Sequence, residues 1–303
     1  MERVIVFGNQ LIGVEGVKIL GEQPGMEVVL AVGCESETDR RSGYPSLKDY
    51  CQTVGIPFCQ PERMDKEFLL MLKGLDPSFC FSLNYRSIFN NDFIKLPTKG
   101  FVNLHPSPLP RYRGPTPYFW ALLNGEKEYG TTLHYIDQGI DTGDIISQAK
   151  FAIPDGITGF EFNSLVMQQG AELFKRSVEG IISGSNERVP QDHSQATYYG
   201  PFRESLRWID WTDSQGKTLN RIKALTRPYS GAIAEVAGQK VTIWSAQSVQ
   251  REKGQGFKGP GRIVEAQEGQ FVVSTVEGYV LISNFQTEGE SNELIRVGSR
   301  FTI

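Results

Sequence analysis

Short apolar runs that alternate with helical patterns organise the first half of the chain. The stretches between the runs place apolar side chains at the three- and four-residue spacing of a helix. We expect strands over residues 3–7, 28–32, 79–83 and 101–104. Strands that alternate with helices predict an α/β fold with a doubly wound, mostly parallel sheet. Ligands of such sheets bind at the carboxyl ends of the strands.

The pattern changes in the second half. A long helical pattern begins near Thr158 and ends at Gly184, with its apolar side chains on one face, as expected of a helix packed against a core. Residues 185 to 204 are polar, and their hydrophobic positions show neither helical nor strand periodicity. Short strands with glycine turns follow, which is typical of a small β-barrel. We therefore expect a catalytic domain over 1–190, a linker over 191–204 and a barrel domain over 205–303.

Composition narrows the class of protein. The chain has 303 residues, enough for two domains, and its hydrophobic content of 39% includes no apolar run that approaches a membrane span. The first residues enter a strand directly, and the 4 cysteines form no C-x-x-C pair. We therefore expect a cytoplasmic protein with no membrane partner, no disulfide framework and no metal. A net charge of −4 argues against nucleic acid as a partner.

Candidate chemistry follows the strand at 101–104. Asn103 and His105 lie at its end, and Asp141 lies in an acidic loop farther along. A neutral imidazole can take a proton from an attacking amine, an amide can hold a developing oxyanion, and a carboxylate can fix the tautomer of the imidazole. This combination indicates acyl transfer. Of the other histidines, His134 is expected to be structural and His193 to have no chemical role.

Three segments around these residues carry a resemblance to a known family. Asn103 to Pro110, the basic stretch Arg111 to Gly114, and Asp137 to Gly143 resemble the N10-formyltetrahydrofolate-dependent formyltransferases, which read N-x-H-x-S-x-L-P, then R-G, then D-x-G-x-D-x-G. The resemblance implies a Rossmann-like formyltransferase domain followed by an OB-like β-barrel. It also implies N10-formyltetrahydrofolate as co-substrate and an amine as acceptor, and it is compatible with a homodimer. Asn103, His105 and Asp141 fall on the catalytic positions.

The resemblance also implies ligand contacts. The folate slot is expected at Leu83, Tyr85, Ile88, Ile136, Asp137 and Gln138. The acceptor is expected at Gly8, Asn9, Gln10, Ser107, Arg111 and Arg113. Asn9 and Gln10 either contact substrate or cap a helix, and Tyr85 and Ile88 either contact folate or pack their loop. The two arginines either meet a phosphate of the acceptor or the glutamate tail of the folate.

The acceptor is inferred from what the chain lacks. The loop over residues 33–43 carries three acids and two bases, whereas a tRNA-binding loop needs net positive charge. Glycinamide ribonucleotide formyltransferases generally lack a C-terminal barrel. We therefore expect a nucleotide-linked amino sugar. The alternatives are a methionyl-tRNA formyltransferase and a regulatory module that binds folate or nucleotide without turnover, although ligand binding alone needs no general base.

Overall fold

A computed structural model describes residues 1–34, 36, 43–250, 259–289 and 294–302. The chain forms two compact units, each assembled from separate segments. The first unit comprises Met1–Pro117, Glu128–Ala152 and Ser164–Gly200. The second comprises Tyr118–Lys127, Ile153–Asn163 and Pro201–Ile303. The loop that informed the choice of acceptor, residues 33–43, lies mostly outside the described residues.

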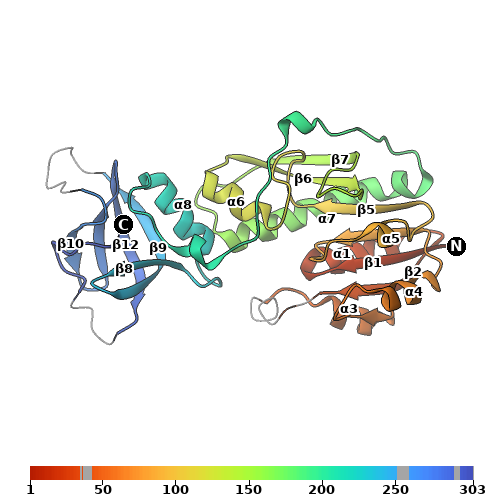
Figure 1. The fold of residues 1–303 in the computed structure, drawn as a ribbon, viewed down its shortest axis with the longest axis horizontal. Coiled ribbons are helices and arrows are strands. Elements are labelled where there is room, and N and C mark those ends of the chain that lie inside the picture. Colours follow the sequence, from red (N-terminus) through yellow and green to blue (C-terminus); the bar gives the residue numbers. More distant parts are fainter. Residues whose placement is uncertain (35, 37–42, 251–258, 290–293, 303) are drawn as a thin grey trace. The chain divides into compact units, whose positions relative to one another are not determined.

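The first unit is a seven-stranded sheet in the order β3-β2-β1-β4-β5-β6-β7 (Figure 1). Its strands are β1 (Glu2–Gly8), β2 (Met26–Gly33), β3 (Phe58–Cys59), β4 (Phe79–Leu83), β5 (Gly100–His105), β6 (Glu128–Tyr135) and β7 (Ile145–Ala152). The first five pair in parallel, and β6 and β7 add to β5 in antiparallel register. The predicted mostly parallel sheet is confirmed.

Helices cover both faces of this sheet. They are α1 (Gln10–Gly21), α3 (Leu47–Val54), α4 (Lys66–Lys73), α5 (Asn91–Ile94) and most of α7 (Gly159–Ser183). The residues of α4 and α5 bury Leu72 and Phe93 against one face, together with Phe7. On the other face, Gly16 of α1 and Phe174 of α7 pack against β4. Because neighbouring strand residues point to opposite faces, each helix layer receives every second side chain.

The segment after α7 packs on the first unit. Residues 185–200, which we call the strap, run along the first unit. Val189 forms an antiparallel bridge with Ile145 at the exposed edge of β7, and the Tyr135 hydroxyl donates to Asn186 at 3.1 Å. The strap therefore covers an edge that would otherwise present unpaired backbone groups.

The second unit contains an antiparallel sheet in the order β10-β11-β12-β9-β8. Its elements are α6 (Pro117–Asn124, from Tyr118), η2 (Glu204–Arg207), α8 (Gln215–Leu225), β8 (Ala232–Val236), β9 (Gln239–Val249), β10 (Ile263–Gln267), β11 (Gln270–Ser274) and β12 (Tyr279–Thr287). Phe301 bridges to β8 and Arg300 bridges to Arg262 beside β10, so the end of the chain joins the two sheet edges. Trp211 is fully buried and stacks on Phe301 at 5.1 Å. These contacts agree with the predicted β-barrel.

Candidate active site

Strand β5 presents the two central side chains. Asn103 and His105 are two residues apart, so they point to the same face of the sheet. Pro106, Pro108 and Pro110 follow at once and end the strand, because proline cannot donate to a sheet ladder. Both side chains therefore lie at the carboxyl edge of the parallel strands, where ligands of this architecture bind.

The His105 imidazole is held between a carbonyl and a carboxylate. Its Nε2 lies 3.0 Å from the Tyr112 carbonyl oxygen, and its Nδ1 lies 3.4 Å from Asp141 Oδ1. A carbonyl oxygen only accepts, so Nε2 carries the hydrogen and donates it. In the neutral ring Nδ1 is then the basic atom. The imidazole therefore makes its hydrogen bond to the Tyr112 carbonyl, and the Asp141 carboxylate faces the other ring nitrogen, which would take up a proton.

A second histidine fixes Asn103. The β5–β6 register places His134 directly opposite Asn103, whose Nδ2 donates to His134 Nε2 at 3.0 Å. His134 Nδ1 donates to the Tyr135 carbonyl at 2.8 Å, which leaves Nε2 as the acceptor. Complete burial lowers the pKa of His134 to about 4, although the nearby Asp141 carboxylate raises it. His134 is thus a neutral acceptor that orients the amide of Asn103 and leaves its second N–H to point elsewhere.

Asp141 is held by backbone contacts. The Gly114 N–H donates to its Oδ2 at 2.8 Å, and Gln191 Nε2 donates to its backbone carbonyl at 2.9 Å. Within the part of the chain that the structure describes, no lysine or arginine forms an ion pair with this carboxylate. Its negative charge therefore acts on His105 and His134.

The expected acceptor contacts lie in different environments. Gly8, Asn9 and Gln10 are buried at the end of β1, and the Asn9 side chain makes no capping hydrogen bond to α1. The side chain of Gln10 accepts from Asn84 Nδ2 at 3.1 Å. Ser107 is fully buried and donates to the Arg111 carbonyl, and the Arg111 side chain is exposed. Arg113 is fully buried and does not face solvent.

The residues expected to contact the folate are also partly buried and partly exposed. Leu83 is buried, and Ile136 is partly buried in the core on the α4–α5 face. Tyr85 packs on Phe7, and partial burial raises its pKa to about 12. Gln138 and Ile88 are exposed, the latter by 79%. Asp137 accepts from the Gly139 N–H and the Thr142 hydroxyl, which shapes the loop before Asp141.

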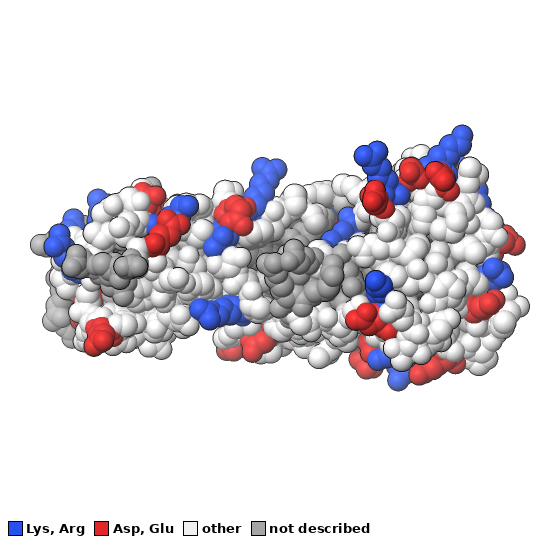
Figure 2. Space-filling view, turned by 90° about the horizontal axis from the view of Figure 1, so that it is seen from below, with Lys and Arg blue, Asp and Glu red and all other residues white. Residues whose placement is uncertain are grey.

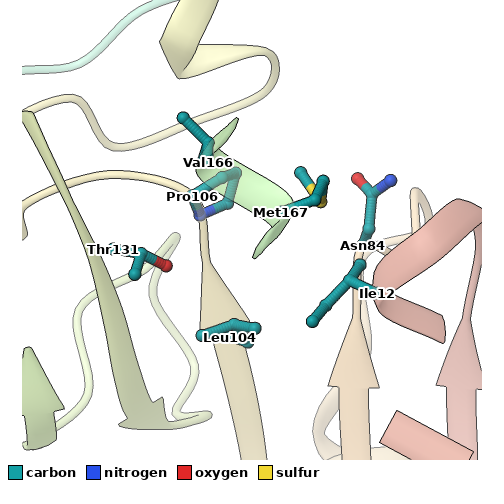
Figure 3. Close-up of a pocket in the computed structure, with 7 residues that line it drawn as sticks. All are labelled: Ile12, Asn84, Leu104, Pro106, Thr131, Val166 and Met167. Carbon is teal, nitrogen blue, oxygen red and sulfur yellow. The ribbon is translucent and has the colours of Figure 1, made fainter. Parts of the chain in front are cut away.

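A small, mostly apolar pocket lies on the other face of β5 (Figure 3). It is lined by Ile12, Asn84, Leu104, Pro106, Thr131, Val166 and Met167. Leu104 points opposite to Asn103 and His105, so this pocket and the imidazole occupy opposite faces of the same strand. Across the described residues, histidine, cysteine and acidic side chains form no group that could hold a metal ion, and no helix is long and apolar enough to cross a membrane.

Sequence reasoning missed His134, Gln191 and the Tyr112 carbonyl. The signal for His134 was its alternation with the residues around it, which puts it on one face of β6. Its position opposite Asn103 depends on strand register, which the sequence does not show. A backbone carbonyl leaves no signal in residue identity.

An amide donor, an imidazole and a carboxylate at one sheet edge form a site suited to acyl transfer. The formyl transferase family model matches residues 5–178, and the formyl transferase C-terminal domain model matches residues 203–295. The chain belongs to the formyl transferase family, and it is an N-formyltransferase.

Relatives resemble most of the chain. The methionyl-tRNA formyltransferase of Pelotomaculum thermopropionicum is 32% identical over 292 residues, covering 95% of this chain and 91% of that protein. That of Carboxydothermus hydrogenoformans is 35% identical over 244 residues, covering 80% and 78%. Among solved structures, an N-formyltransferase from Helicobacter canadensis in complex with folinic acid and dTDP-3-aminofucose has a TM-score of 0.74 at 23% identity. It covers 94% of this chain and 100% of that chain.

Proposed function

We propose that this enzyme transfers the formyl group of N10-formyltetrahydrofolate to the primary amine of a nucleotide-linked amino sugar. The observation that carries the chemical step is the arrangement of Asn103, His105 and Asp141. The amide is oriented by a neutral histidine, and the basic nitrogen of the imidazole faces the carboxylate.

In the proposed reaction the neutral amine attacks the formyl carbon, and a tetrahedral intermediate with an anionic oxygen forms. The second N–H of Asn103 donates to that oxygen, a contribution of about 3–4 kcal/mol for a donor of this kind. His105 Nδ1 takes the proton from the amine, which contributes roughly 10²–10⁴ in rate. Asp141 stabilises the imidazolium. The carbon–N10 bond then breaks, and His105 returns the proton to the leaving nitrogen.

Charge supports a small acceptor. The net charge is −4, and several of the described surface cations lie beside acids, as in the pairs Lys18–Glu15 at 2.7 Å and Arg207–Glu204 at 2.8 Å. On the face drawn in Figure 2, the described blue and red side chains are scattered with white surface between them, and the blue ones form no large continuous patch. A protein that binds tRNA needs several uncompensated cations. One nucleotide diphosphate needs only a few donors.

The second candidate is methionyl-tRNA. It is favoured by relatives of that name that are 32–35% identical over most of this chain, whereas the Helicobacter canadensis sugar-bound structure is 23% identical. Both candidates share the donor and the chemical step. They differ in the size and charge of the acceptor.

One experiment separates them. The protein is incubated with N10-formyltetrahydrofolate and, in parallel, a panel of dTDP- and UDP-linked amino sugars or initiator methionyl-tRNA, with uncharged tRNA as control. We expect formylation of an amino sugar and no salt-sensitive tRNA binding. Formylation of methionyl-tRNA, with affinity that falls steeply as salt rises, would replace the amino-sugar proposal by its rival. Saturable folate binding without turnover of any acceptor would favour the regulatory module.

A further inference from the structure

Arg113 is a charged side chain inside the protein without a charged partner. It is fully buried, and its Nη groups donate to the Tyr198 hydroxyl at 2.5 Å, to Gln191 Oε1 at 2.6 Å and to His193 Nδ1 at 3.1 Å. None of the described carboxylates pairs with it, and its Nε has no hydrogen-bond partner among the described atoms. Burial of an unpaired guanidinium is expensive, so a protein that retains one draws some other benefit from it.

All three partners of this guanidinium lie on the strap. The backbone of Arg113 adds to the attachment, since its N–H donates to the Thr197 carbonyl and its carbonyl accepts from the Tyr199 N–H, each at 2.9 Å. The strap is therefore fastened at the residue between Tyr112 and Gly114. Those two neighbours are the residues whose backbone groups hold His105 and Asp141.

The two residues whose oxygens face the ring nitrogens of His105 both have strained backbones. Tyr112 has φ of 62° and Asp141 has φ of 55°, in the left-handed region that non-glycine residues rarely adopt. Such conformations persist only where the surroundings hold them in place. The strap supplies these contacts at both points. The Thr197 hydroxyl accepts from the Tyr112 N–H at 2.8 Å, and Gln191 Nε2 donates to the carbonyls of Asp141 at 2.9 Å and Gly143 at 2.8 Å.

We propose that Arg113 and Gln191 are positioning residues for the formyl transfer. Arg113 binds the oxygen of the Gln191 amide, so the nitrogen end of that amide must face the Asp141 loop. The attachment of Arg113 to the strap, with the Thr197 hydroxyl, also holds the strained Tyr112 so that its carbonyl lies against His105 Nε2. The strap is thus part of the active site, although it touches no reacting atom. The effect on rate rests on the proposed function, whereas the effect on the His105 ring does not.

The discriminating variant is Gln191→Glu. Its carboxylate would pair with the Arg113 guanidinium, so the strap stays attached. It would also present an oxygen to the carbonyls of Asp141 and Gly143 in place of the N–H donor, and would push that loop away. The matched control is Asn186→Ala, which removes another amide contact between the strap and the sheet, one that does not reach His105 or Asp141.

The first readout is kcat. We expect Gln191→Glu to lower kcat at least tenfold with little change in KM for the folate, and Asn186→Ala to stay within about twofold of the wild type. Arg113→Lys should fall between them, because an ammonium cannot reach all three partners at once. Retention of wild-type kcat by Gln191→Glu in a protein with wild-type melting would overturn the proposal.

The second readout needs no turnover. Nitrogen NMR of protein labelled at its 3 histidines reports which ring nitrogen carries the hydrogen. We expect neutral His105 to carry it on Nε2 in the wild type, in Asn186→Ala and in Gln191→Glu, and as a mixture of tautomers in Arg113→Lys, which loosens the strap behind the Tyr112 carbonyl. An unchanged tautomer in Arg113→Lys refutes the positioning role of Arg113 whatever the acceptor is. A mixed tautomer in an enzyme that formylates no acceptor would instead retain the positioning role and reject the proposed function.

Discussion

Acid pH should destabilise the first unit because of His134. Burial lowers the pKa of this imidazole from 6.5 to about 4, so the folded protein resists a proton that the unfolded chain binds readily. The free energy of unfolding is therefore at its full value above about pH 6.5, where the ring is neutral in both the folded and the unfolded state. It decreases as the pH falls toward 4, because only the unfolded chain then binds the proton. This shift corresponds to about 3 kcal/mol. In the folded protein the ring takes up its proton only near pH 4, and that proton would turn the acceptor of Asn103 into a donor, so activity should fall as the pH approaches 4.

The distribution of tryptophan makes the assay specific. All 4 tryptophans, Trp120, Trp208, Trp211 and Trp244, lie in the second unit. Tryptophan fluorescence therefore follows that unit, whereas hydrogen exchange of peptides from β6 follows the unit that holds His134. Both signals are followed in urea titrations at a series of pH values from 8 to 4. As the pH falls, the urea concentration at which the β6 peptides lose protection should begin to decrease at a higher pH than the midpoint of the fluorescence transition does.

The perturbation is His134→Gln. The new amide can accept from Asn103 and donate to the Tyr135 carbonyl, but it does not titrate. Its unfolding free energy should therefore change by about 3 kcal/mol less than that of the wild type between pH 7 and pH 4. Carboxylates titrate in both proteins and cancel in the comparison. If His134→Gln loses stability as steeply as the wild type, the proton is taken up elsewhere and the reasoning is wrong.

Three further predictions concern the site and the second unit. Asn103→Ala, His105→Ala and Asp141→Ala should each lower kcat by at least about 10²-fold, with losses that do not add because all three act on one intermediate; near-native turnover of His105→Ala would exclude it as the base. Gly114→Ala should impair both folding and turnover, since φ is 100° and the added Cβ would lie 2.3 Å from a strap carbonyl; unchanged melting and kcat would contradict this. Trp211→Ala should destabilise the second unit by about 3–5 kcal/mol, measured by urea titration followed by circular dichroism; a loss below about 1 kcal/mol would contradict its placement in the core.

The parallel half of the fold could be predicted because its strands are short, apolar and separated by helices. The run at 79–83 coincides with β4, and the runs at 3–7 and 28–32 lie inside β1 and β2. The antiparallel pair β6 and β7 was not predicted, since an apolar run carries no information about its direction. Closure of the second sheet by Phe301 was equally hidden, because it depends on a contact between residues far apart in the sequence.

The same division holds at the site. The sequence by itself determined that Asn103 and His105 share one face, since two residues along a strand return to the same side of the sheet. Only the tertiary structure decided what holds them. His134 reaches Asn103 through the β5–β6 register, and Gln191 reaches the Asp141 loop across a chain separation of fifty residues. Residue types reveal which chemistry is available. Which atoms face one another depends on strand register and on contacts between segments far apart in the sequence. The packing of the whole unit sets both.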